Sequence, residues 1–220
     1  MFFEKQALVE TKQRERRLRL LVKRINQERK RQAKKTDILC NDLIAAQREF
    51  IKRLEVINFT SCFYASIVGT GDLNTLLNAA GRFIEEETDD IHVAFFLRQR
   101  DTFEVHMIDT AGPVSLHCQD LQSCFTSELV DNICKSNRIC TLEDMFAMGL
   151  QGNLMRLKEI SAATIPLEQG GASEGFMLVY RSSARRLTAN ELNRLAATSS
   201  GLSRAIACCR VPLHCTKQEF

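Results

Sequence analysis

The first sixty residues carry apolar side chains at a helical spacing, among many charged ones. They contain no Pro and no Gly, and they are rich in residues that lose least on entering a helix. We therefore predict one long helix or two abutting helices. Read in sevens, one recurring position holds Val22, Arg29, Thr36, Leu43, Phe50 and Ile57. The other holds Leu18, Ile25, Gln32, Leu39, Ala46 and Arg53.

These two positions form a seam that is apolar at both ends and polar in the middle. An isolated helix of this polarity is marginal in water, so pairing along the seam is its expected source of stability. We predict a coiled-coil homodimer, parallel or antiparallel, that is broken or loosened between Arg29 and Thr36. Its predicted dimerisation residues are Leu18, Val22, Ile25, Leu39, Leu43, Phe50 and Ile57.

The rest of the chain has the pattern of an α+β domain with an antiparallel sheet. Asp72 is placed to cap a helix, and two strand pairs follow, at 91–97 with 103–109 and at 162–167 with 175–180. A short helix is expected at 127–134, a strand at 138–141 and a loop at 144–155. Thr188 and Glu191 form a capping box before the last helix. We expect a coiled-coil helix at 1–60, a sensor domain at 61–212 and a tail at 213–220.

Charge divides the chain in the same place. Residues 1–60 carry 16 Lys and Arg against 8 Asp and Glu, and residues 61–220 carry 14 against 19. A solvated coiled-coil surface explains the basic part most simply. A nucleic-acid-binding surface is an alternative, and attachment to a membrane surface through Phe2 and Phe3 is another.

The globular part resembles a GAF domain over about 140 residues. The resemblance rests on the helix that starts at Asp72-Leu-Asn-Thr-Leu-Leu, on Ile91-His-Val-Ala-Phe-Phe-Leu and Ala163-Thr-Ile-Pro-Leu, and on the closing segments. Those segments are Glu174-Gly-Phe-Met-Leu-Val-Tyr and Leu187-Thr-Ala-Asn-Glu-Leu-Asn-Arg-Leu. The resemblance implies a GAF-like antiparallel sheet flanked by helices, with a ligand pocket beneath residues 118–155. The candidate ligand-binding residues are His106, Cys118, Phe125 and Phe176.

Family members bind cyclic nucleotides, bilins, haem, small metabolites or metal centres, and many only dimerise. This chain lacks the Asn-Lys-x-Asp type of motif found in cyclic-nucleotide binders. His117 and Cys118 stand in the reverse order from the bilin-attaching pair. The signature of the GAF-like methionine sulfoxide reductases is also missing, because no third cysteine lies near Met155. The cofactor is therefore unknown.

Nine cysteines, with no C-x-x-C, indicate free thiols in a reducing compartment, and we expect the protein in the cytoplasm. The run from Met1 has no secretory pattern, and the longest uncharged stretch, 56–71, is too short to span a bilayer. The redox candidates are Cys118, Cys124, Cys134 and Cys140, although buried structural thiols are the commoner reading. No metal site and no catalytic triad is expected, and His106 is more simply a core histidine.

We therefore expect a non-enzymatic signalling or regulatory protein, in which a coiled-coil dimer carries a small-molecule-sensing or protein-interaction domain. Because the sequence ends at Phe220, shortly after the last predicted helix, we expect a partner protein to supply the output. Two alternatives remain open at this point. One is a thiol-based redox sensor or enzyme that uses the four clustered cysteines, and the other is a nucleic-acid-binding protein that uses the basic helix.

Overall fold

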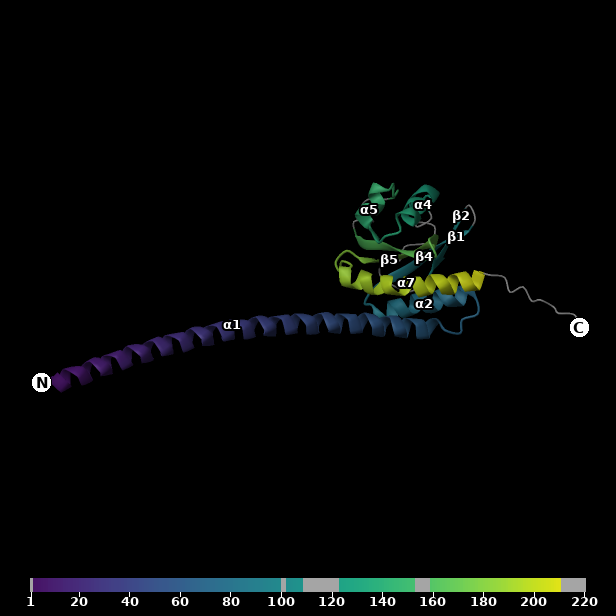
Figure 1. The fold of residues 1–220 in the computed structure, drawn as a ribbon. Coiled ribbons are helices and arrows are strands. Elements are labelled where there is room, and N and C mark those ends of the chain that lie inside the picture. Colours follow the sequence, from purple (N-terminus) through teal and green to yellow (C-terminus); the bar gives the residue numbers. More distant parts are fainter. Residues whose placement is uncertain (1, 100–101, 109–122, 153–158, 211–220) are drawn as a thin grey trace, which may run out of the picture. The chain divides into compact units, whose positions relative to one another are not determined.

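The structure of the chain is a computed structural model. It describes residues 2–99, 102–108, 123–152 and 159–210, by backbone alone at 2–11, 169 and 172. Helix α1 runs from Phe2 to Ile67 without interruption (Figure 1), so the prediction of one long helix is confirmed and the alternative of two is wrong. Looser pairing between chains near Arg29 stays a prediction. The chain divides into two compact units, 1–55 and 56–220, while the predicted domain boundaries at 60 and 212 stay predictions.

The second unit is built on a five-stranded antiparallel sheet with the strand order β2-β1-β5-β4-β3. Its strands are β1 (His92–Gln99), β2 (Thr102–Met107), β3 (Cys140–Thr141), β4 (Ile160–Gln169) and β5 (Ala172–Ser182). Both predicted hairpins, β1-β2 and β4-β5, are present in the sheet. The prediction of an α+β fold with an antiparallel sheet is therefore confirmed.

Helices cover both faces of this sheet. Helices α2 (Leu73–Glu87) and α7 (Ala189–Arg210) lie against one face, and α4 (Ser127–Ser136) and α5 (Leu142–Ala147) lie against the other (Figure 1). The loop expected at 144–155 is wrong over its first residues, because α5 includes 144–147. A Gly-free capping box starts that helix.

Three short polar motifs determine where the helices of this unit begin. The Asp72 carboxylate accepts a hydrogen bond from the Thr75 amide at 2.8 Å and caps α2. The Thr141 hydroxyl accepts from the amide three residues on, and the Asp144 carboxylate accepts from the Thr141 amide at 2.9 Å, which starts α5. The same reciprocal pair, formed by Thr188 and Glu191, starts α7 as predicted. Each motif satisfies amide groups that a helix end otherwise leaves unpaired.

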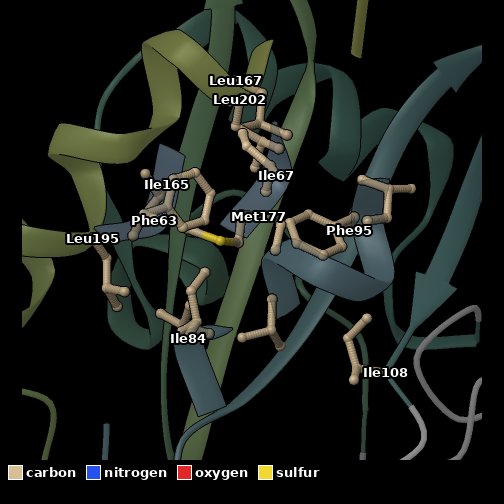
Figure 2. Packing of buried hydrophobic residues seen from close by; sticks show 14 of the residues in the cluster. Phe63, Ile67, Ile84, Phe95, Ile108, Ile165, Leu167, Met177, Leu195 and Leu202 are labelled. Atoms are coloured by element: carbon tan, nitrogen blue, oxygen red, sulfur yellow. The ribbon is translucent and has the colours of Figure 1, made fainter. Parts of the chain in front are cut away.

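One hydrophobic core lies between the sheet and the helices α2 and α7, and we call it the first core (Figure 2). Its side chains come from the inward-facing positions of β1, β4 and β5, such as Phe95 and Met177, and from Leu195 and Leu202 of α7. Phe63, in the last turns of α1, is fully buried in the same core. The end of α1 is therefore part of the globular fold.

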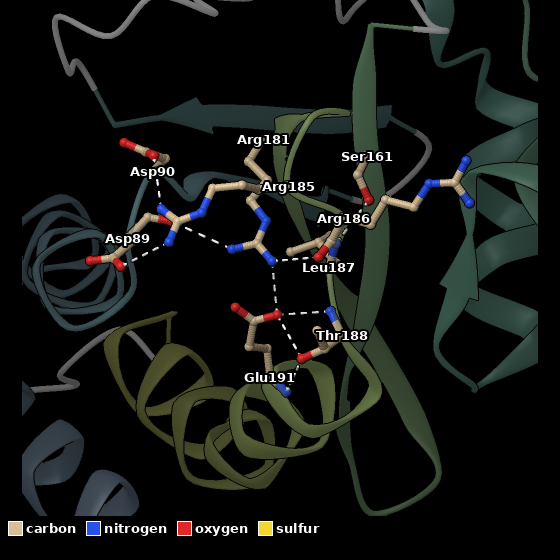
Figure 3. Close-up of polar contacts among 9 residues, drawn as sticks. All are labelled: Asp89, Asp90, Ser161, Arg181, Arg185, Arg186, Leu187, Thr188 and Glu191. Carbon is tan, nitrogen blue, oxygen red and sulfur yellow. Dashed lines mark hydrogen bonds and ion pairs between the residues drawn. The ribbon is translucent and has the colours of Figure 1, made fainter.

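A buried arginine fastens the start of α7 to the sheet (Figure 3). Arg181 of β5 is only 5% exposed, and its Nη2 donates to Glu191 Oε2 at 2.9 Å and to the Arg186 carbonyl oxygen at 2.6 Å. Burial alone raises the pKa of Glu191, but hydrogen bonds from Thr188 and the charge of Arg181 leave this pKa below its ordinary value. Because these charges are paired with each other, we interpret the cluster as structural.

Candidate functional site

A second apolar cluster fills the space between the sheet and the helices α4 and α5, and we call it the second core. It corresponds to the place where the sequence predicts a ligand pocket. Three phenyl rings dominate it, from Phe96 of β1, Phe176 of β5 and Phe125 just before α4. The ring centroids of Phe96 and Phe176 lie 4.7 Å apart at an interplanar angle of 14°. Phe125 lies 4.7 Å from Phe96 and 6.0 Å from Phe176.

Local sequence explains how these rings meet. Thr126 caps α4 by accepting a hydrogen bond from the Leu129 amide at 3.3 Å, which fixes the direction in which the chain enters the helix after Phe125. Gly175 precedes Phe176 with φ at +141°, and a Cβ atom added there would collide with the Phe96 carbonyl oxygen. Glycine thus permits the close approach of β5 to β1 that stacks the two rings.

The rings differ in how far they are buried. Phe96 and Phe176 are at most 1% exposed, whereas Phe125 is half-buried at the margin of the cluster. A molecule that entered the second core from this side would therefore meet Phe125 first. Phe125 and Phe176 are two of the predicted ligand-binding residues, and the structure brings them together, while their binding role stays a prediction.

One polar group in the second core lacks a hydrogen-bond partner among the described residues. The side chain of Thr164 in β4 is fully buried, and its hydroxyl has no partner there. Thr164 pairs in register with Leu178, a second-core residue, so it faces the same side of the sheet. An unpaired buried hydroxyl costs about 1–3 kcal/mol, so this atom is the group that a water molecule or ligand would satisfy. The sequence analysis missed it, although the alternation of 160–167 indicates its face.

The structure places His106 on the other side of the sheet. It lies opposite Phe95, which belongs to the first core, while its neighbours Val105 and Met107 pack on the second core. Its Nε2 lies 3.2 Å from Glu104 Oε1, which is its nearest described partner. The structure therefore does not bring His106 together with Phe125 and Phe176. Cys118, the fourth predicted ligand-binding residue, lies outside the described residues.

The described redox candidates all lie at the second core. Cys134 and Cys140 are buried, and Cys124 is half-buried beside them. Burial raises the pKa of the Cys134 thiol, which is opposite to what a reactive thiolate requires. The Cys140 thiol lies 3.3 Å from the Ser136 hydroxyl. No group of three or more His, Cys, Asp or Glu with metal-binding geometry occurs in the part of the chain that the structure describes.

A polar groove of about 740 Å³ lies beside the second core, at the end of α4 and the tip of the β4-β5 hairpin. Both signs of charge line it, from Arg98, Asp131, Lys135 and Glu168. Arg98 Nη2 lies 3.9 Å from Asp131 Oδ1, and the Asn137 side-chain amide donates to the Glu168 carboxylate. Because the charges offset each other, the groove favours neither an anion nor a cation.

The seam on α1 is fully open to solvent within its unit. Its seven predicted dimerisation residues each expose between 53 and 67% of their surface. They recur at intervals of three and four, so they form a continuous stripe along one side of the helix. We call this stripe the first seam.

A second exposed apolar stripe runs beside the first one on the same helix. Cys40, Ile44, Ile51 and Leu54 also recur at intervals of three, four and seven, and the last three are 45, 55 and 47% exposed. Each residue turns the helix by about 100°, which places this stripe roughly a quarter turn from the first seam. We call it the second seam. Two adjacent seams are typical of a helix that contacts two neighbours.

Comparison with solved structures places the globular unit among GAF domains. The GAF domain of a phosphoenolpyruvate-protein phosphotransferase from Coxiella burnetii superposes with a TM-score of 0.54 at 11% identity, over 71% of this chain and 95% of that one. A far-red absorbing protein with bound biliverdin IXa gives 0.51 at 13% identity, over 69% and 98%. The fRMsr protein of Staphylococcus aureus, solved with its substrate, gives 0.50 at 12% identity, over 69% and 95%.

The fold is therefore GAF-like, as the sequence predicts. No family model and no curated protein matches the chain. Among the described helices, none is both long and apolar enough to cross a membrane.

Proposed function

We propose that the chain is a non-enzymatic regulatory protein that acts as a homodimer, with α1 as the dimerisation helix and the GAF-like domain as the regulated part. The observation that carries this proposal is the first seam, an apolar stripe that stays exposed along α1. A helix with so many exposed Leu, Ile and Val side chains gains stability when a second helix covers them. The GAF-like fold of the globular unit supports the regulatory part of the proposal.

Light scattering on the full chain tests the dimer directly. The expected mass is twice the 25.0 kDa of one chain at micromolar concentration. A strict monomer under these conditions would remove the premise of the proposal. Placement in the cytoplasm stays a prediction.

The second seam supports an output through a partner protein. Once the first seam is covered, Ile44, Ile51 and Leu54 remain on a flank that a two-stranded coil does not fill. We propose that a partner helix with its own apolar stripe packs there. Two further copies of this chain are a poorer fit, because residues 12–35 carry twelve Lys and Arg against two Glu and would repel one another. A matched pair of light-scattering measurements, on the wild type and on Ile44→Gln/Ile51→Gln, tests this, since both should have the mass of a dimer.

Small-molecule sensing is a second candidate function, and the Thr164 hydroxyl favours it. A ligand of the second core would be mainly apolar, with one hydrogen-bonding group for Thr164, and it would displace the Phe125 ring. One structural neighbour is described with bound biliverdin IXa, but the stacked rings occupy the described part of this cluster. Native mass spectrometry of the purified protein reports both stoichiometry and any retained molecule.

Thiol chemistry is the enzymatic alternative, and the comparison with fRMsr keeps it testable. Against it stand the burial of Cys134 and Cys140 and the raised pKa of Cys134. An enzyme of this kind needs a thiol that reacts fast with an alkylating probe at neutral pH. Uniformly slow labelling of Cys118, Cys124, Cys134 and Cys140 would support the non-enzymatic proposal.

A further inference from the structure

The strongest concentration of charge in the molecule lies on α1 at residues 12–35, which we call the basic segment. It holds twelve Lys and Arg against two Glu, a net charge of +10 in 24 residues. Every side chain in the segment is exposed. At a rise of 1.5 Å per residue the segment is about 36 Å long. That length is close to one turn of a nucleic-acid duplex, roughly 34–36 Å.

The basic residues are not spread evenly over the segment. Three pairs recur every seven residues, as Arg16-Arg17, Lys23-Arg24 and Lys30-Arg31. Successive pairs are therefore about 10.5 Å apart along the helix. We call these six residues the basic ladder. Because the first seam has the same period of seven, the ladder keeps a constant position relative to it along a supercoiled dimer.

The ladder lies on the outer side of the predicted dimer. Within each heptad, the pair follows directly after a first-seam position such as Val22, which puts its two side chains about 100° and 200° around the helix from that residue. A second helix packed on the first seam leaves that side in water. The inference therefore rests on the proposed function, since dimerisation is what keeps the apolar side chains away from this surface.

Few of these charges are neutralised within the chain. Among the described residues, the ion pairs in the segment are Arg19 with Glu15 at 2.7 Å and Arg31 with Glu28 at 3.2 Å. Both pairs are strongly exposed, so each contributes little to stability. The other members of the ladder have no carboxylate partner in the described part of the chain. A line of unneutralised guanidinium and ammonium groups attracts a line of negative charge.

We propose that the basic ladder binds the phosphate backbone of duplex nucleic acid. A duplex offers one negative charge per about 1.7 Å along its axis, and release of its counterions makes such contacts favourable. The ladder residues are Arg and Lys only, which hold phosphates without reading bases, so binding is independent of sequence. A membrane surface fits less well, because the apolar side chains that would enter lipid are covered in the dimer and Leu20 is the exception.

The test measures the affinity of the full chain for a labelled 24-base-pair DNA duplex by fluorescence anisotropy across a salt series. The ladder variant is Arg16→Gln/Arg17→Gln/Lys23→Gln/Arg24→Gln, which keeps good helix formers at all four positions. The matched control removes four exposed positive charges elsewhere, as Arg48→Gln/Lys52→Gln/Arg82→Gln/Arg204→Gln. Both variants have the same net charge, so a general charge effect changes them equally.

The wild type should bind with an affinity that falls steeply with salt. Each lost phosphate contact lowers the slope of log affinity against log salt by about 0.9. The ladder variant should therefore lose on the order of 100-fold or more in affinity near 0.1 M salt and about three units of slope. The control should stay close to the wild type. Equal losses in the two variants, or no binding by the wild type, would overturn the proposal.

Two further measurements on the same samples separate this proposal from the dimer. Light scattering reports the mass: a dimer that does not bind duplex overturns the ladder alone, and a monomer that binds duplex overturns the dimer alone. Vesicles with anionic lipid and poly-glutamate serve as competing polyanions. Binding to either one with an affinity equal to that for the duplex would show a surface for acidic partners in general, and it would overturn the assignment to nucleic acid.

Discussion

Replacing two first-seam leucines by glutamate is the most direct perturbation of the proposed dimer. Leu39 and Leu43 are 67 and 60% exposed in the single chain, so most of each side chain is available for burial against a partner. Full burial of a leucine contributes about 1.5–3 kcal/mol, so the exposed part contributes roughly 1–2 kcal/mol. The dimer contains each residue twice. Leu39→Glu/Leu43→Glu therefore removes about 4–8 kcal/mol of gross association energy.

A loss of that size corresponds to a rise of about 1,000-fold or more in the dissociation constant, at 1.4 kcal/mol per factor of ten. Ile38→Glu/Asn41→Glu is the matched control, since it adds the same two charges to exposed positions on a different side of the same helix turns. Sedimentation velocity over a concentration series measures both constants, and circular dichroism checks that the helix persists. Equal dissociation by the two variants would refute the seam, as would a seam variant that keeps the wild-type constant.

Three further predictions concern the globular unit and the thiols. Phe125→Ala should lower the free energy of unfolding in urea by about 1–2 kcal/mol, since the ring is half-buried, and the space left should let benzene raise the melting temperature more than in the wild type. Glu191 has a lowered pKa, so its stabilising contribution is present above its ordinary value of 4.5 and is lost as the pH falls through the folded-state pKa. Glu191→Gln should therefore flatten the fall in melting temperature between pH 5 and 3, roughly the range of that loss. Iodoacetamide should label the exposed Cys40 and Cys208 in the folded protein but Cys134 only after unfolding, as peptide mass mapping would show.

Local signals predicted the elements whose ends are fixed by neighbouring residues. The Thr188 and Glu191 capping box, the Asp72 cap and the two hairpins are each encoded within a few residues, and the structure contains all of them. Helix α5 was missed although Thr141 and Asp144 form the same kind of capping box. The Gly and Met residues that follow obscured a helix of only one and a half turns, which carries little periodicity of its own.

The candidate site was less predictable, because both faces of the sheet are covered by apolar layers. In a half-exposed sheet the polar positions mark the outer face, but here each strand has buried side chains on both sides. His106 therefore looked equally suited to either face, and its pairing with Phe95 decides the matter only once the register is known. Phe96, Phe125 and Phe176 come from three separate segments, so their stacking is a property of the tertiary fold.

The two halves of the exposed part of α1 place opposite demands on whatever surrounds the dimer. Around Lys23 and Lys30 the outer side is charged, which keeps it hydrated and excludes another apolar surface. Around Ile44 and Ile51 the flank is apolar, and leaving it in water forgoes roughly 1 kcal/mol per side chain. A single uniform partner cannot satisfy both, because a polyanion gains nothing from the apolar flank and an apolar helix gains nothing from the charges. Separate partners on the two halves satisfy both demands, so loss of the basic ladder should leave binding at the second seam intact, and the reverse should hold as well.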